Sequence, residues 1–183
     1  NIFNGSKKRI FKLKHDEAPL ASFSGALFYH TGKIHLAVYG KLGVHIYSDL
    51  TGSLNSFHLP IHNPNYIVSD SIYIYISESI TFNSVIYRCN PSSYESIFFS
   101  NSFISSFDII NDKLCVSEST FKGHNLIVID SVGKDIFYSS KKSIQEVIFA
   151  DDSTVMFNHG QNGIVNSKML SIINGEVISL TNF

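Results

Sequence analysis

A β-strand pattern returns along this chain about every 40 residues. Each copy contains a polar turn, an apolar strand, a loop and a second apolar strand that ends in Asp or Asn. The first strands begin at Lys33, Ser71, Lys113 and Ser153, and the later strands end at Asp49, Asn90, Asp130 and Asn174. Because two separate landmarks keep the same register, the chain is predicted to repeat one β-unit of the length of a propeller blade.

The residue types within these units are those of strands rather than helices. Ile72, Ile74 and Ile76 alternate with more polar neighbours, whereas the segment 126–129 is a continuous apolar run. The chain contains 15 Phe and 9 Tyr, which favour strands. We therefore predict an all-β propeller made of about four repeats, each with four antiparallel strands.

The spacing of the landmarks also predicts where the repeats lie. We expect an N-terminal edge strand within residues 1–20 and four blades at residues 21–62, 63–102, 103–142 and 143–183. The segment 9–14 has the pattern of an outer strand, yet the last blade already has an outer strand near residues 177–180. This surplus strand favours a run of blades from a larger propeller, and a self-contained ring of four blades is the alternative.

The first blade resembles the blades of a known family of propellers. The stretch from His30 to Pro60, HTGKIHLAVYGKLGVHIYSDLTGSLNSFHLP, is similar to a kelch-type or F-box-associated propeller blade, and NDKLCVSESTFKGHNLIVIDSVGKDI in the third blade follows the same template. The chain has no Trp, and the family's diglycine is reduced to Gly40 in the first blade. The resemblance implies recognition of a protein or ligand by loops at one rim of the propeller.

Composition excludes several classes of protein. A net charge of -1 with 16% charged residues lacks the positive surface of a nucleic-acid binder. The basic residues in segment 7–14 alternate with apolar ones, which indicates an edge strand with lysines in solvent; phosphate or membrane contact is the alternative. Cys89 and Cys115 are expected to be buried thiols rather than a disulfide framework.

No pattern of residues predicts catalysis or metal binding. Five of the eight histidines (His30, His35, His45, His58 and His62) fall in or just after the first blade, but Pro60 prevents a helical pairing of the last two. The recurring acidic residues at the turns are explained by turn formation. No nucleophile elbow or phosphate-binding loop is present. We expect a non-catalytic protein without a cofactor or metal.

The loops between the second and third strands of the blades are the best candidates for a binding surface. The triplets Ser77-Glu78-Ser79 and Ser117-Glu118-Ser119 are identical, and polar loops follow at residues 121–125 and 158–163. In a propeller these loops emerge on one rim, where a rigid scaffold can present them to a ligand. The candidate binding residues are Glu78, Glu118, Phe121, His124, His159, Gln161 and Asn162; the alternative is that these loops are simply solvated.

We therefore predict a protein-binding or scaffolding module, whose partner is another protein or the remaining blades of a larger propeller. The alternative is an extracellular protein that binds or cleaves carbohydrate, with Glu78 and Glu118 as the carboxylate pair that a glycosidase would need. Tyrosines would stack on the sugar in this alternative, such as Tyr73, Tyr75, Tyr87 and Tyr94. No apolar run has the length of a membrane-spanning helix and no signal-peptide pattern is seen. The sequence thus favours a soluble, intracellular protein with no nucleic-acid or membrane partner.

Overall fold

The computed structural model describes residues 24–40, 43–47, 56–70, 72–161 and 163–182. Four antiparallel sheets of four strands each follow one another along the chain. The first two sheets contain β1 (Ser24–His30), β2 (Lys33–Gly40), β3 (Gly43–Tyr47) and β4 (Ser56–Leu59), then β5 (Pro64–Ser69), β6 (Ile74–Ile80), β7 (Asn83–Asn90) and β8 (Ser93–Ser100). The last two contain β9 (Phe103–Ile110), β10 (Lys113–Thr120), β11 (Gly123–Ile129) and β12 (Lys134–Ser140), then β13 (Ser143–Asp151), β14 (Thr154–Gln161), β15 (Ile164–Ser171) and β16 (Val177–Ser179).

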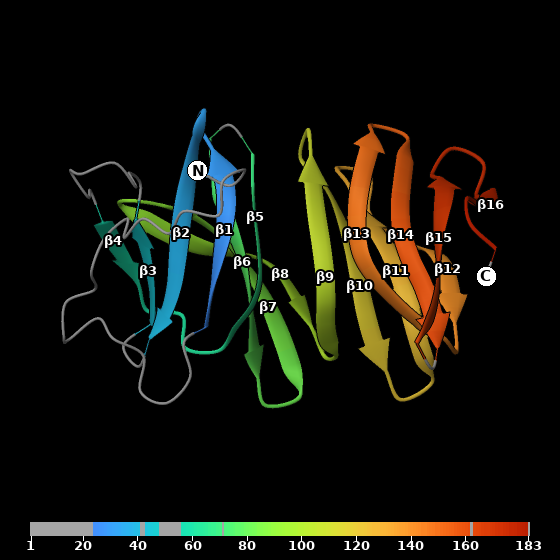
Figure 1. Cartoon of the computed structure of the whole chain (residues 1–183), viewed down its shortest axis with the longest axis horizontal. Coiled ribbons are helices and arrows are strands. Elements are labelled where there is room, and N and C mark those ends of the chain that lie inside the picture. The colour runs from blue at the N-terminus through green and yellow to red at the C-terminus, as the bar shows by residue number, and fades with distance from the viewer. Residues whose placement is uncertain (1–23, 41–42, 48–55, 71, 162, 183) are drawn as a thin grey trace, which may run out of the picture.

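The sheets stand in succession like the blades of a propeller (Figure 1). Within each sheet the strands pair in chain order, and the first strands of neighbouring sheets pack on one another, so that β5 contacts β1, β9 contacts β5 and β13 contacts β9. The first strands therefore form the inner layer of the array. The predicted all-β propeller of four-stranded repeats is confirmed.

Local turn chemistry explains why the first two strands of a repeat form a hairpin. The two-residue turns Thr31-Gly32 and Asn111-Asp112 have positive φ at both positions, 48° and 76° in the first and 47° and 61° in the second. This is the backbone of a type I′ turn, whose twist matches the twist of the strands that it joins. Asn, Asp and Gly adopt positive φ at low cost, so Asn111-Asp112 encodes its turn locally. In the first turn only Gly32 does so, because Thr31 is β-branched and strained at positive φ.

Apolar side chains fill the seams between neighbouring sheets. Ala37 and Ile46 of the first sheet pack on Ile76 of the second, and Tyr75 of the second packs with Phe107 of the third. The third seam joins two sheets through its own cluster: Cys115, Leu126, Val128, Ile144, Val147, Phe149, Val155, Phe157 and Leu170. Each blade therefore buries apolar surface against its neighbours, as repeat architectures require.

Hydrogen bonds connect the inner strands β9 and β13 across the third seam. The backbone N–H of Val147 donates to the hydroxyl of Ser106 over 3.2 Å, and the N–H of Phe149 donates to Oδ2 of Asp108 over 2.7 Å. Both pairs lie 41 residues apart in the sequence. The repeat length thus appears directly in the contacts between consecutive blades.

Three further expectations concern the ends of the chain and its cysteines. Cys89 and Cys115 are free and buried, as predicted. The expected N-terminal edge strand lies outside the described residues. Among the residues that the structure describes, no helix has the length and apolar character needed to cross a membrane.

Candidate functional site

Turns from two neighbouring blades meet at one end of the sheets, the lower end in Figure 1. The β6–β7 turn is formed by Thr81 and Phe82, the β8–β9 connection by Asn101 and Ser102, and the β10–β11 turn begins at Phe121. Together they enclose a pocket of about 290 Å³. We call this the rim pocket; its lining residues are Thr81, Phe82, Asn83, Asn101, Ser102, Phe103, Ser119, Thr120 and Phe121.

The rim pocket is marked by exposed aromatic side chains. Phe82 is 79% exposed, Phe121 is fully exposed, and Phe103 at the start of β9 is about half exposed. These three residues come from three separate segments that only the fold brings together. Apolar side chains that gather at one exposed place indicate an interaction surface more often than a single exposed residue does.

A second, more open hollow lies beside the rim pocket. It has a volume of about 620 Å³ and is lined by residues 120–125 and 139–141. Phe121 lines both hollows and therefore stands between them. Lys122 and Lys141 place positive charge on the second hollow, which we call the basic hollow.

Gly123 lets the turn pass close to the end of β12. Its φ is +141°, and a Cβ atom at this position would lie 2.4 Å from the carbonyl oxygen of Ser140. No side chain fits at that distance, so the residue that follows the turn must be glycine for β11 to start here. The close approach sets the position of His124 in the basic hollow.

Two predicted histidines lie in or behind the basic hollow. His124 is hydrogen-bonded through Nδ1 to the hydroxyl of Ser119 over 2.9 Å, and burial lowers its pKa. His159 lies behind Ser140, with 2.7 Å between its Nε2 and the Ser140 hydroxyl. Burial, followed by the charges of Lys168 and Lys142, lowers the pKa of His159. Both imidazoles are therefore mainly neutral at pH 7.

The sequence predicts Glu78 and Glu118 in loops, but the structure places both in strands. The Ser-Glu-Ser triplets lie inside β6 and β10, because each strand continues to Ile80 or Thr120 before it turns. Glu78 and Glu118 are each 7% exposed, and neither lines the two hollows described above.

Both carboxylates have partners within the fold. Oε1 of Glu78 accepts hydrogen bonds from the backbone N–H groups of His62 at 2.8 Å and Asn63 at 3.4 Å. Oε1 of Glu118 forms an ion pair with Nζ of Lys134 at 3.6 Å. Buried carboxylates with such partners hold connections in place. The geometry gives no support to a glycosidase pair made of these two residues.

The predicted site residues also include Gln161 and Asn162, and the first blade contributes a group of histidines. Gln161 ends β14, but its side chain and the whole of Asn162 lie outside the described residues. His30 donates through Nδ1 to the carbonyl of Asp70 over 2.8 Å, and His35 donates through Nε2 to the carbonyl of His30 over 3.1 Å. Within the described part of the chain, no three His, Cys, Asp or Glu side chains gather as a metal site would require.

Sequence reasoning missed two of the aromatic residues at the rim pocket. Phe82 stands in the short turn of TFNS, where a polar residue is the usual choice, and this departure was a usable signal. Phe103 gave no such signal, because an aromatic residue at the start of a strand is equally consistent with a place in the core.

Comparisons with known proteins support the fold and no more. No protein-family model and no curated protein matches the chain. Among solved structures, a chain of a nidogen/laminin complex matches with a TM-score of 0.62 and 10% identity over 82% of this chain. The computationally designed Ika4 protein matches with a TM-score of 0.51 and 12% identity over 85% of this chain.

The two matched chains differ in how much of them is covered. The present chain spans 59% of the nidogen/laminin-complex chain and 98% of the designed protein. Identities this low establish propeller-like architecture alone. Neither match confirms the more specific resemblance to kelch-type or F-box-associated blades.

Proposed function

We propose that this chain is a non-catalytic protein-binding module that receives an apolar side chain of its partner in the rim pocket. The observation that supports the proposal is the convergence of Phe82, Phe103 and Phe121 on one pocket from three separate segments. When a partner covers exposed phenylalanines, their apolar surface is removed from water, which favours binding. Aromatic residues commonly anchor protein interfaces.

The scaffold suits this role because the phenylalanines are held by strands on either side. Phe82 and Phe121 each stand in a two-residue connection between paired strands, so little backbone conformational entropy remains to be lost on binding. The hydroxyl and amide groups of Ser102 and Asn101 line the same pocket and can bind the partner's backbone. A rigid apolar site with a few polar groups is the usual form of a recognition pocket.

The positive charge of the basic hollow favours a partner segment that carries an acidic residue. Lys122 and Lys141 line the hollow next to Phe121, and no Asp or Glu is among its lining residues. The partner segment that fits both hollows carries an aromatic or aliphatic residue with Asp or Glu a few positions away. His124, which is mainly neutral, can donate or accept a hydrogen bond beside that carboxylate.

A displayed library of random peptides tests this proposal on the full chain. The expected result is a group of enriched peptides that share an apolar anchor and a nearby acidic residue. Their affinity should fall at least tenfold for Phe121→Ala, which corresponds to about 1.4 kcal/mol. Val132→Ala is the matched control, because Val132 is strongly exposed in the β11–β12 connection and lines neither hollow.

Two outcomes would overturn the proposal. Peptides that bind Phe121→Ala as well as the unchanged chain would place recognition elsewhere. Specific binding on a glycan array that survives Phe121→Ala, without any enriched peptide, would instead support the carbohydrate-binding alternative.

A further inference from the structure

Two serine–histidine pairs meet at the end of the seam between the third and fourth sheets, beside the basic hollow. Ser119 of β10 pairs with His124 of β11, and His124 pairs with Ser140 of β12, so the three side chains lie on one face of the third sheet. His159 of β14 joins them from the fourth sheet, with 2.7 Å between its Nε2 and the Ser140 hydroxyl. We call these four residues the seam cluster; His124 and Ser140 also line the basic hollow.

The charges gathered around the seam cluster are positive. Lys122 and Lys141 line the basic hollow. Burial is the largest cause of the lowered pKa of His159, and the charges of Lys168 and Lys142 are the next largest. Among the described residues, no negative charge contributes to this shift. Positive charge gathered in this way at an open hollow favours a bound anion.

The glutamates of the neighbouring strands face away from the seam cluster. Glu118 directly precedes the cluster residue of β10, so its side chain lies on the opposite face of the third sheet, where it forms an ion pair with Lys134. Glu146 of β13 accepts a hydrogen bond from Asn158, which directly precedes the cluster residue of β14 and therefore lies on the outward face of the fourth sheet. Neither glutamate lines the basic hollow, so an anion bound there meets neither of these like charges.

The hydrogen bonds of the seam cluster allow it to respond to an anion. The backbone N–H of Lys142 donates to Oγ of Ser140 over 2.9 Å, which leaves the Ser140 hydroxyl hydrogen for Nε2 of His159. The hydroxyl of Tyr138 lies 3.4 Å from the same nitrogen and itself accepts a hydrogen bond from Nζ of Lys168 at 3.2 Å. Nε2 is therefore the acceptor while His159 is neutral. Once protonated, Nε2 donates to Ser140, and the Ser140 hydroxyl can donate to an anion in the hollow.

We propose that the basic hollow binds phosphate, in the form of a phosphoserine or phosphothreonine placed near the apolar anchor of the partner. The inference rests on the proposed function and replaces the acidic residue of the partner by a phosphorylated one. Phe121 stands between the two hollows, so one extended segment can reach both. A phosphate monoester carries a charge of about −1.5 to −2 at pH 7 and three acceptor oxygens, which suit the lysines and the Ser140 hydroxyl better than a single carboxylate does.

A bound phosphate should draw a proton onto the seam cluster. A dianion near His124 and His159 favours their charged forms and so raises both pKa values from their lowered values in the free chain, against the opposing charges of Lys142 and Lys168. The phosphate itself stays mainly dianionic above about pH 6. Binding should therefore tighten as the pH falls from about 8 to about 6.5, because the complex holds more protons than the free chain.

Inorganic phosphate tests the anion site without any peptide. In the full chain, the imidazole resonances of the seam cluster should move toward the protonated form as phosphate is added at about pH 7.5, with chloride as the reference at the same ionic strength. Lys122→Ala combined with Lys141→Ala should weaken this response at least tenfold. Lys33→Ala combined with Lys113→Ala is the matched control, because both lysines begin strands at the opposite end of the sheets. No saturable response beyond that to chloride, or equal responses of the two double variants, would overturn the proposal.

Calorimetry with synthetic peptides identifies the source of the phosphate. Three peptides share a phenylalanine and carry phosphoserine, glutamate or serine a few positions later. The phosphoserine peptide should bind at least tenfold more tightly than the glutamate peptide. Its binding at about pH 7 should take up protons, measured in phosphate-free buffers of different ionisation enthalpy, and His159→Gln should reduce this uptake. His62→Gln is the matched control, because His62 is exposed and lies outside the seam cluster.

The two proposals fail in different ways. A phosphoserine peptide that binds no more tightly than the glutamate peptide, or that binds without proton uptake, would overturn this inference and leave the rim-pocket proposal standing. Binding to vesicles that contain a phosphoinositide, without binding of the phosphoserine peptide, would also overturn this inference. A phosphoserine peptide that binds Phe121→Ala as tightly as the unchanged chain would overturn the rim-pocket proposal alone.

Discussion

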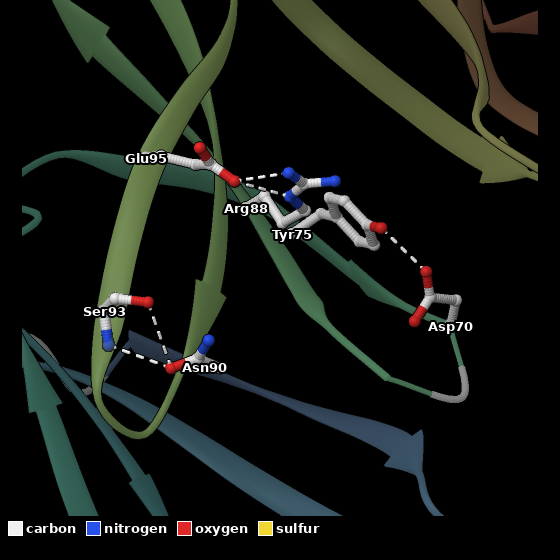
Figure 2. A network of polar contacts seen from close by, with 6 residues as sticks. All are labelled: Asp70, Tyr75, Arg88, Asn90, Ser93 and Glu95. Carbon is white, nitrogen blue, oxygen red and sulfur yellow. Dashed lines mark hydrogen bonds and ion pairs between the residues drawn. The ribbon is translucent and has the colours of Figure 1, made fainter.

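The hydroxyl of Tyr75 donates a hydrogen bond to Oδ2 of Asp70 over 2.7 Å, which ties the core of the second sheet to the turn that precedes it (Figure 2). The other carboxylate oxygen of Asp70 accepts the backbone N–H groups of Ile72 at 2.6 Å and Tyr73 at 2.7 Å. One carboxylate therefore shapes the β5–β6 connection and anchors it to a tyrosine that is almost fully buried.

Tyr75→Phe should destabilise the fold through the loss of this bond. The substitution leaves the ring in place and removes one hydrogen bond to a charged acceptor, which typically contributes about 1.5–3 kcal/mol. We expect the free energy of unfolding, measured by urea denaturation, to fall by about 1.5 kcal/mol. Tyr94→Phe changes an exposed tyrosine and serves as the control. Equal effects of the two substitutions would contradict the assignment.

Asp70→Asn should remove part of the chain's sensitivity to acid. Burial raises the pKa of Asp70, but the hydrogen bonds from Tyr73, Tyr75 and Ile72 together outweigh it and the net shift is downward. A carboxylate with a lowered pKa in the folded state stabilises the fold above its unfolded pKa of about 3.9 and loses that contribution as the pH falls through the folded value. Urea midpoints between pH 2 and 6 should therefore fall less steeply for Asp70→Asn than for the unchanged chain.

Asp108→Asn should have the opposite pH signature. Burial raises the pKa of Asp108, and the hydrogen bonds from the backbone N–H groups of Phe149 and Ile109 only partly offset it. Because the folded pKa lies above the unfolded value, this carboxyl favours the folded state most at low pH and loses that contribution as the pH rises through the folded value.

The amide oxygen of Asn can still accept the hydrogen bond from Phe149, so the seam remains paired in Asp108→Asn. Relative to the unchanged chain, Asp108→Asn should gain stability between about pH 4 and pH 7. A stability difference that does not change over this range in urea titrations would show that Asp108 has an ordinary pKa.

The fold was predictable because its determinants are local. Asn111-Asp112 encodes a tight turn, and alternating residues such as Ile74 and Ile76 encode a strand, whatever lies elsewhere in the chain. The recurrence of these signals about every 40 residues was enough to predict blades. The arrangement of side chains at the rim was harder to predict, because it depends on which segments meet.

The prediction that Glu78 lies in a loop was wrong, and the reason is a contact between distant segments. Its carboxylate is satisfied by the backbone of His62 and Asn63, about 16 residues earlier in the chain, and no local pattern announces that contact. A glutamate between two serines therefore suggests a solvated loop when it is read by itself. Phe121 lies in the β10–β11 turn, as expected, whereas His124 lies just inside β11. That these two residues bind a partner stays a prediction.

The two cysteines should be unreactive until the fold opens. Burial raises the pKa of Cys89 to about 12 and that of Cys115 well above its ordinary value, so the thiolate that attacks a disulfide reagent is scarce. At pH 8, a thiol with a pKa of 12 is about a thousandfold less ionised than an ordinary cysteine. Labelling with a chromogenic disulfide should be complete within minutes in denaturant and at least a thousandfold slower in its absence. Met156→Cys should add one rapidly reacting thiol to this slow background, and fast labelling of the unchanged chain would show that the seams holding Cys89 and Cys115 are open in solution.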